Sequence, residues 1–448
     1  MNRRHFLSAT ALAAALAAAP LMRRAHAAPG ADRYVRYRGQ TVAMSIPEHP
    51  HYDAMLRVLA AFTRHTGIHV EVDRRPIPAM KRLQGQALSA AQGDYDLVSY
   101  FAKWRDPYVR ARLIRDLTPY LRDPALADPA YDLADIVPAY LENIGLAGGP
   151  RGDPAGPGVG LFGLPYGAET SILAYRQDLF AGLGLQAPRN YAQLRHLLPL
   201  LRERTGLGAL ASRARAGHHC VHAWLLHLAP LGGRVFDAGW RPRLNDAAGC
   251  EALELLKRIV DTGPPGAPGF DQHDMLQAFL QGEAAMYLDS TLVFGAVRDP
   301  ARSRVAGKVA YALHPRGVRA ASQTGGLGLA IPTNARHPQA AFLLLQWLTA
   351  KRQDRWVTLA GGVPARMSTM RDARVLERFP EYRIMRQQLC FADPDWRPLV
   401  AAWDGLDVGC MGSAIADALN GRKTVREALD GAAAEVAAVM QRAGYYGA

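Results

Sequence analysis

The regular alternation of short apolar strands with amphipathic helices constrains the fold of this chain more than any other feature of its sequence. A helical pattern of apolar residues ends at Thr66-Gly67, where glycine favours a helix C-terminus. Strand–helix alternation at this spacing predicts parallel strands with crossover helices, which form an open α/β sheet. The predicted elements alternate as strand, helix, strand, helix, strand and helix, at residues 40–46, 55–66, 68–72, 80–91, 95–100 and from Pro107 onward.

Polar loops follow the first and third of these strands. One loop spans 47–52 after Ile46, and the other spans 100–104 after Ser99. Ligands of open α/β sheets bind at the carboxyl ends of the strands. These two loops are therefore the first candidates for a ligand site.

The remainder of the chain predicts a second α/β region followed by a helical end. A strand at Ser171–Tyr175 opens this region, which runs to about Val309. The segments Gly148–Gly163 and Gly263–Gly269 are dense in glycine and proline and indicate loops. The last helix begins within Gly421–Leu429, and no repeat of solenoid period is visible.

The first 27 residues have the three parts of an export signal. The pair Arg3-Arg4 precedes an apolar run, Phe6–Leu21, and the segment ends in Ala25-His26-Ala27. A membrane anchor is the alternative, but the run is shorter than the roughly 20 residues that a span needs. The arginine pair resembles the twin-arginine class of signals, whose cargo is folded before transport. The sequence thus predicts a cleaved twin-arginine signal peptide over 1–27 and a periplasmic mature protein.

Length and charge exclude several functions. Removing the leader leaves about 420 residues, enough for two lobes with substantial cores. The net charge of +13 includes the four leader arginines, and the remaining arginines are scattered among acids rather than grouped in a basic block. We therefore expect no nucleic-acid partner. No later apolar stretch approaches the length of a membrane span, so the mature chain is expected to be soluble.

Four cysteines enter an oxidising compartment if the chain is exported. They form no Cys-x-x-Cys pair, which argues against a redox motif or a zinc ribbon. Four cysteines allow three disulfide connectivities, and one or two disulfides or four buried thiols are equally compatible with the sequence. The residues are Cys220, Cys250, Cys390 and Cys410.

Four blocks in a fixed order carry a family resemblance. Together they resemble family 1 extracellular solute-binding proteins, the sugar receptors of ABC importers that include maltose-binding protein. Each block also has a plain structural meaning; Gly325-Gly326, for example, allows close backbone approach before an apolar strand. The blocks are Gly163–Tyr166 with Tyr175–Phe180, Phe279–Met286, Gly325–Pro332 with Ala340–Thr349, and Asn420–Leu429.

The resemblance implies a two-lobed, class II periplasmic-binding-protein fold. Each lobe would be an open, mainly parallel α/β sheet with flanking helices, and the ligand would bind in a cleft between them. Hinge closure on the ligand would create the surface that the importer recognises. The implied N-terminal lobe is 28–164 plus 314–348, the C-terminal lobe is 168–310 plus 353–448, and the hinge crossings lie near 165–167, 311–313 and 349–353.

The resemblance also implies a function. The chain would bind a neutral carbohydrate or polyol and deliver it to the permease of an ABC importer, without a cofactor, as a monomer. A neutral polyol requires aromatic faces against its C–H surfaces and planar polar groups for its hydroxyls. Which sugar, how tightly, and for which permease are not contained in the sequence.

In the first lobe, the candidate ligand residues come from the two loops at strand ends. Family members often carry Asp and Lys where this chain has His49 and Pro50, so hydroxyl recognition is expected to differ. An exposed loop and core packing of the aromatic rings are the structural alternatives. The candidates are Glu48, His49, Tyr100, Lys103 and Trp104, with Glu169 following the hinge segment.

In the second lobe, the segment His218–Trp224 holds three histidines and a cysteine. A metal site is one interpretation, but the segment introduces an apolar helix, and the family has polar and aromatic ligand residues here. Asp289 and Thr291 follow a predicted strand at 284–288. The candidates in this lobe are His219, His222, Trp224, Asp289, Thr291, Trp403 and Asp407, and Gly326 lies in the glycine pair.

Other functions remain as alternatives. The chain contains no nucleophile elbow, no His-Glu-x-x-His helix and no phosphate loop, so an enzyme is not expected. Asp404 and Asp407 could form a carboxylate pair for glycoside hydrolysis, yet nothing marks them as catalytic. A polyamine receptor would need more cleft carboxylates, and a receptor for a phosphorylated solute would need cleft arginines, where the loops offer only Lys103 and nearby Arg105.

Overall fold

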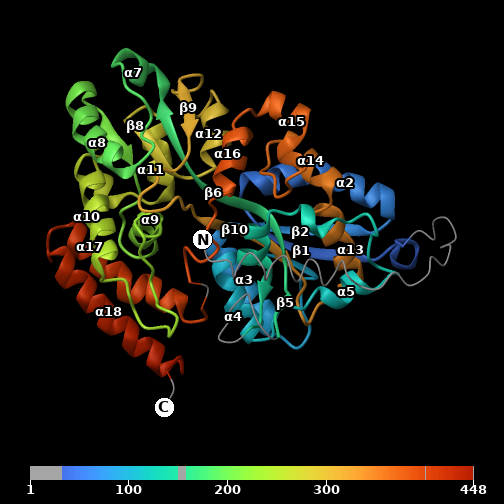
Figure 1. Ribbon diagram of the computed structural model, residues 1–448. Helices are drawn as coiled ribbons and strands as arrows, with labels where there is room; N and C mark the ends of the chain where they lie inside the picture. Colours follow the sequence, from blue (N-terminus) through green and yellow to red (C-terminus); the bar gives the residue numbers. More distant parts are fainter. Residues whose placement is uncertain (1–32, 150–157, 399, 447–448) are drawn as a thin grey trace. The chain divides into compact units, whose positions relative to one another are not determined.

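The computed structural model describes residues 33–149, 158–398 and 400–446. The predicted signal peptide over 1–27 lies outside these residues. The chain forms two compact units, each with strands and flanking helices (Figure 1). The first unit comprises the chain up to Ala168 with Gly325–Pro380 and Leu399–Ala401, and the second comprises Glu169–Thr324, Glu381–Pro398 and Ala402–Ala448.

The sheet of the first unit has the predicted parallel core. Strand β1 (Thr41–Pro47) lies between β2 (His69–Arg75) and β3 (Leu97–Phe101), both parallel to it, and β10 (Thr324–Ala330) runs antiparallel to β3. The remaining elements are η1 (Val35–Tyr37), α2 (Pro50–Thr66), α3 (Ile77–Ser89), η2 (Ala102–Trp104), α4 (Arg105–Arg110), α5 (Thr118–Arg122), η3 (Leu133–Asp135), α6 (Pro138–Tyr140), η4 (Leu141–Gly145), β4 (Leu146–Ala147), β5 (Gly160–Leu161), α13 (Pro338–Leu348), α14 (Lys351–Leu359), η7 (Thr369–Arg371) and α15 (Ala373–Arg378).

The sheet of the second unit is mixed. Strand β8 (Ala284–Ser290) is parallel to β7 (Gly208–Ala211) and antiparallel to β6 (Leu164–Arg176), which also pairs antiparallel with β9 (Val309–Ala312). The helices of this unit are α7 (Gln177–Gly182), α8 (Tyr191–Thr205), α9 (His218–Leu228), α10 (Ala247–Asp261), η6 (Ala267–Gly269), α11 (Gln272–Leu280), α12 (Val293–Arg298), α16 (Tyr382–Leu389), η8 (Gly405–Met411), α17 (Gly412–Leu419) and α18 (Val425–Arg442).

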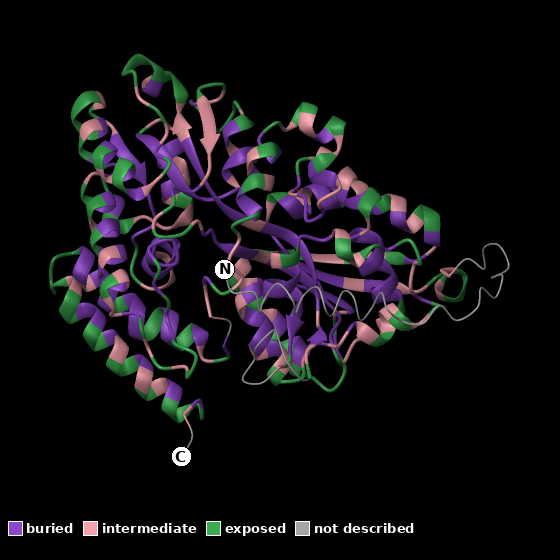
Figure 2. Ribbon diagram, viewed as in Figure 1, coloured by how far each residue is buried: buried purple, intermediate pink, exposed green. Residues whose placement is uncertain are grey.

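Local sequence explains where the helices begin and end. In α2, Pro50 stands at the first turn, His49 caps the N-terminus and Gly67 ends the helix at a φ of 72°. Helix α18 begins with a capping box in which Thr424 and Glu427 each bond the other's backbone N–H. Its buried residues, Ala428, Leu429, Ala432, Val436 and Met440, lie on one face, and Figure 2 shows the exposed residues of this helix in green and the intermediate ones in pink.

The division into units differs from the predicted lobes at two places. Residues 353–380 belong to the first unit because α14 packs on α2 and Val363 donates its N–H to His51 Nδ1 at 3.0 Å. Residues 314–324 belong to the second unit, where His314 Nδ1 lies 2.9 Å from Ser171 Oγ. The first change of unit, after Ala168, lies beside the predicted crossing at 165–167. The role of these crossings as hinges stays a prediction.

Two further findings concern the whole described chain. Among the described residues, no helix combines the length and apolar character needed to cross a bilayer. All four cysteines are free thiols, so neither of the disulfide arrangements left open by the sequence is formed. Cys390 is exposed and the other three are buried.

A buried chain of polar side chains runs through the second unit. Tyr191 Oη lies 3.0 Å from His227 Nδ1 and 2.9 Å from His314 Nε2, and His314 Nδ1 lies 2.9 Å from Ser171 Oγ. We call these four residues the Tyr191 relay. Burial lowers the pKa of both His227 and His314 to about 3, so both rings are neutral at physiological pH.

The relay predicts that acid destabilises the protein. In the unfolded chain these histidines have a pKa near 6.5, so unfolding takes up protons between about pH 6.5 and pH 3. The free energy of unfolding therefore falls as the pH is lowered, by about 1.4 kcal/mol per pH unit for each histidine. Urea unfolding from pH 7 to pH 4 measures this slope. His227→Gln should make it shallower, and the exposed His196→Gln should not; equal slopes in both variants and the wild type would contradict the prediction.

Candidate functional site

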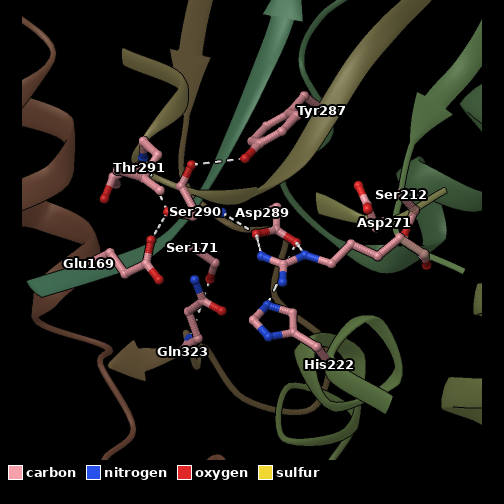
Figure 3. Close-up of polar contacts among 12 residues, drawn as sticks. Glu169, Ser171, Ser212, His222, Asp271, Tyr287, Asp289, Ser290, Thr291 and Gln323 are labelled. Carbon is pink, nitrogen blue, oxygen red and sulfur yellow. Dashed lines mark hydrogen bonds and ion pairs between the residues drawn. The ribbon is translucent and has the colours of Figure 1, made fainter. Parts of the chain in front are cut away.

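The centre of the candidate site is a buried ion pair at the ends of two parallel strands. Arg213 follows β7 and Asp289 stands near the end of β8, so the parallel pairing brings them to the same sheet edge. Arg213 Nε donates to Asp289 Oδ2 at 2.8 Å and Nη2 donates to Oδ1 at 2.5 Å (Figure 3). Their side chains are only 4% and 1% exposed. The two-point geometry is the one that compensates best for burying both charges.

His222 links this pair to a second arginine. Its Nε2 lies 3.6 Å from Asp289 Oδ2, and its Nδ1 accepts a hydrogen bond from Arg397 Nη2 at 3.0 Å. Burial, followed by the charges of Arg213 and Arg397, holds the pKa of His222 well below its usual value. The ring is therefore neutral, and because Nδ1 accepts from Arg397, its proton is on Nε2, which faces Asp289.

In the described part of the chain, the Arg397 guanidinium contacts the aromatic ring of Trp396 rather than a carboxylate. Its guanidinium lies 4.3 Å from the centre of the Trp396 ring, and that ring packs edge-on against His222 at 5.2 Å. Burial lowers the pKa of Arg397 to about 10, with Asp407 acting in the opposite direction, so the side chain stays charged at neutral pH. Among the described residues, its Nε is buried and has no hydrogen-bond partner.

Two carboxyl groups complete the site. Ser290 Oγ donates to Glu169 Oε2, and burial raises the pKa of Glu169 (Figure 3). Asp407 Oδ2 lies 2.6 Å from His218 Nδ1, which joins the start of α9 to η8. Asp289 thus balances the charge of Arg213 directly, while Asp407 acts on Arg397 only through the charge that raises its pKa.

Several buried polar atoms of the second unit have no hydrogen-bond partner within the described part of the chain. Buried donors and acceptors are normally paired, so such atoms indicate groups that bind something else. Most are planar amide, imidazole, guanidinium or indole groups, which suit the hydroxyls and C–H faces of a polyol. They include His219 Nδ1, His222 Nε2, Gln323 Oε1 and Nε2, Arg397 Nε and Trp403 Nε1.

The predicted residues of the first unit have mostly structural surroundings. Glu48 is exposed, and half-buried His49 accepts the N–H of His51 as the N-cap of α2, with its pKa lowered to about 4 by burial. Tyr100 is fully buried and donates to the carbonyl of Ile144 at 2.6 Å. Trp104 is buried against Phe101, and Lys103 is half-buried in η2. Core packing accounts for these surroundings of Tyr100, and its stacking on a sugar stays a prediction.

In the second unit, the predictions divide between the site and the core. Glu169, His222, Asp289 and Asp407 belong to the site described above. Trp224 is fully buried and donates to the carbonyl of Gly249 at 3.0 Å, so packing of α9 on α10 accounts for it.

The other predicted residues have varied surroundings. His219 is half-buried and Trp403 is buried. Thr291 is buried, and its Oγ1 accepts from the N–H of Thr170 at 3.4 Å. Gly326 has a φ of 97°, a backbone conformation that only glycine adopts readily.

Sequence reasoning missed both arginines of the site. Arg213 could have been found, because it lies just after the end of β7, at the same edge of the sheet where Asp289 lies near the end of β8. Arg397 and Trp396 lie in an irregular segment with no strand before them, and Gln323 precedes a strand rather than following one. The metal interpretation of the histidine segment finds no support: the described residues contain no group of three or more His, Cys, Asp or Glu side chains placed to hold an ion.

Comparison with known proteins assigns this chain to a family. The model of the bacterial extracellular solute-binding protein family matches residues 47–355, more than half of the chain. The chain belongs to this family, as its sequence blocks implied, and the solved relatives confirm the two-lobed α/β fold.

Individual relatives are receptors for small polyols. A mannitol-binding protein from Pseudomonas aeruginosa is 30% identical over 347 residues, covering 72% of this chain and 77% of the relative. The structure of an ABC transporter solute-binding protein from Agrobacterium radiobacter K84 in complex with ribitol is 25% identical, with a TM-score of 0.78 over 90% of this chain and 99% of that one. A protein from Agrobacterium vitis S4 with bound D-mannitol has the same fold, at 22% identity, a TM-score of 0.75 and coverage of 90% and 99%.

The Arg213–Asp289 pair predicts a large difference between two equivalent substitutions. Asp289→Asn leaves a buried guanidinium without its counter-charge and should lower the free energy of unfolding by about 3–5 kcal/mol. Asp261→Asn removes the exposed partner of Lys257, 3.0 Å away, and should cost less than about 1 kcal/mol. Urea unfolding of both variants checks this. Similar losses would show that the buried pair is not the stronger constraint.

Proposed function

We propose that this protein is the receptor of an ABC importer for a neutral polyol or sugar, and that the cluster around Arg213 and Asp289 binds the hydroxyls. The observation that carries the proposal is the group of buried polar atoms around the Arg213–Asp289 pair that have no hydrogen-bond partner in the described chain. The names of the relatives support the same ligand class, since they bind mannitol and ribitol. We assign Glu169, His219, His222, Asp289, Trp403 and Asp407 to the ligand site as proposals.

The charge balance argues against the two other ligand classes. A phosphorylated solute requires several free cationic donors, but Arg213 Nε and Nη2 both bond Asp289, and Arg397 Nη2 bonds His222. A polyamine requires carboxylates in excess, but burial raises the pKa of Glu169 and Asp407 lies against His218. A ligand that brings hydroxyls and no charge leaves this balance unchanged.

The remaining parts of the proposal concern what the protein does not do. We propose that it binds its ligand without converting it, needs no cofactor, has no nucleic-acid partner and acts as a monomer. Incubation of the purified protein with its ligand, followed by chromatography of the solution, should return the ligand unchanged. Turnover that is lost in Asp404→Asn would favour the glycan-acting enzyme instead.

A thermal-shift screen of the purified mature protein tests the ligand class. A ligand that binds only the folded state stabilises it by about 2.7 kcal/mol at a hundredfold excess over Kd, which raises the melting temperature by at least a degree or two. We expect a shift with D-mannitol, ribitol or another neutral polyol or sugar. A shift with polyamines or sugar phosphates alone would overturn the ligand class while leaving the family intact.

Arg397 should be the most sensitive position for affinity outside the ion pair. Arg397→Lys keeps the charge but removes the planar donors and the stacking on Trp396, so Kd for the ligand should rise about tenfold or more. Arg422→Lys, in an exposed pair with Asp417, is the matched control and should leave Kd unchanged. Isothermal titration calorimetry measures both. An unchanged Kd in Arg397→Lys would place the ligand elsewhere.

We also propose export to the periplasm by the twin-arginine route. Replacement of Arg3 and Arg4 together by lysine keeps the charge of the leader but removes the arginine pair that this route requires. The doubly substituted precursor should accumulate in the cytoplasm. Cell fractionation and immunoblotting measure the distribution, with Arg23→Lys and Arg24→Lys as the control; export of both substituted precursors would indicate a different route.

A further inference from the structure

Gln323 carries a buried amide with nothing to bind inside the described chain. The residue is only 3% exposed, and both Oε1 and Nε2 are buried without a hydrogen-bond partner among the described residues. An amide that loses its hydrogen bonds to water on burial and gains none within the protein raises the free energy of the folded state. The side chain therefore requires a partner that the described protein does not supply.

The backbone of Gln323 is held firmly by neighbouring residues of β6. Thr170 Oγ1 donates to the carbonyl oxygen of Gln323 at 2.8 Å, and the N–H of Gln323 donates to Ser171 Oγ at 3.3 Å. Ser171 and Glu169 stand two residues apart on β6, so they point to the same face of the sheet. Figure 3 draws Gln323, Ser171 and Glu169 together in the close-up of the site.

Ser171 is in turn the end of the Tyr191 relay. Each neutral histidine has one N–H, so each hydrogen bond of the relay has one donor and one acceptor. All hydrogen bonds of the relay therefore run in the same direction, either toward Ser171 or toward His227. His314 is also fixed from outside, since its backbone N–H donates to Gln388 Oε1 at 2.7 Å. The relay thus connects α8 and α9 to the residue that holds the backbone of Gln323.

From this arrangement, we infer that Gln323 is a further ligand-binding residue and that Tyr191, His314 and Ser171 are positioning residues for it. The inference rests on the proposed function and names a contact within it. One amide offers an acceptor and two donors in a plane, which matches a pair of neighbouring hydroxyls on a polyol. The relay reduces the freedom of Gln323 before binding, so less entropy is lost when the ligand arrives.

The test of Gln323 compares the affinity for the ligand with the stability of the unliganded protein. Gln323→Leu keeps the approximate size of the side chain and removes both polar atoms. Kd for D-mannitol or ribitol, measured by calorimetry, should rise about tenfold or more, while the melting temperature of the unliganded protein stays equal or rises, because the unpaired amide is gone. A merely structural glutamine would give the reverse, with an unchanged Kd and a lower melting temperature.

The test of the relay uses a matched pair of tyrosine variants. Tyr191→Phe removes the hydroxyl that joins the two histidines, and Tyr131→Phe removes a buried hydroxyl of the first unit that lies 2.8 Å from Thr349 Oγ1. Both should lower the melting temperature, but Tyr191→Phe alone should raise Kd, by about threefold or more. Equal Kd values in the two variants would overturn the positioning role.

The wild-type titration separates the failure of this inference from the failure of the proposed function. If the wild type binds no polyol or sugar, the proposed function is wrong and the inference is wrong with it. If the wild type binds and Gln323→Leu binds equally well, only the inference is overturned. A bound ordered water on Gln323 in a crystal structure of the polyol complex would likewise replace the ligand as the partner of the amide and overturn the inference.

Discussion

The buried pair of Arg213 and Asp289 is the interaction on which the site of the second unit depends. A guanidinium and a carboxylate can both leave water only if they remain together, and here each stands at the end of a different parallel strand. The pair therefore fixes the edge of the sheet where β7 and β8 end. The N–H of Ser290 donates to Asp289 and His222 faces the same carboxylate, so the surrounding side chains take their positions from this pair.

Around that pair, the charge of Arg213 is balanced by Asp289, and several buried polar atoms have no hydrogen-bond partner in the described chain. Arg397 rests on the face of Trp396 and donates to a neutral histidine, so it contributes planar donors without a bound counter-ion. A site of this kind gains little from an ionised ligand, because any added charge would upset the balance in a medium of low polarity. It gains more from hydroxyls, which can satisfy donors and acceptors at once.

The order of strands and helices could be predicted from hydrophobic periodicity: strands expected at 40–46, 68–72 and 95–100 lie at Thr41–Pro47, His69–Arg75 and Leu97–Phe101. Of the candidate site, the sequence indicated Glu169, His222, Asp289 and Asp407, which lie in or beside segments that the family resemblance marks. Tyr100 and Trp224 have the same residue types as ligand-stacking aromatics, and only tertiary packing, through bonds to the carbonyls of Ile144 and Gly249, distinguishes a core role. The sequence could not predict the role of Arg397, because its position depends on Trp396 and His222, which are far apart in sequence.

The four free cysteines bear on where this chain acquires its fold. No covalent cross-link between cysteines holds the two units, so each is stabilised by burial and hydrogen bonding alone. Folding then needs no oxidant and no disulfide isomerase, and it can be completed in a reducing compartment. A protein without disulfides can therefore fold completely on one side of a membrane and function on the other.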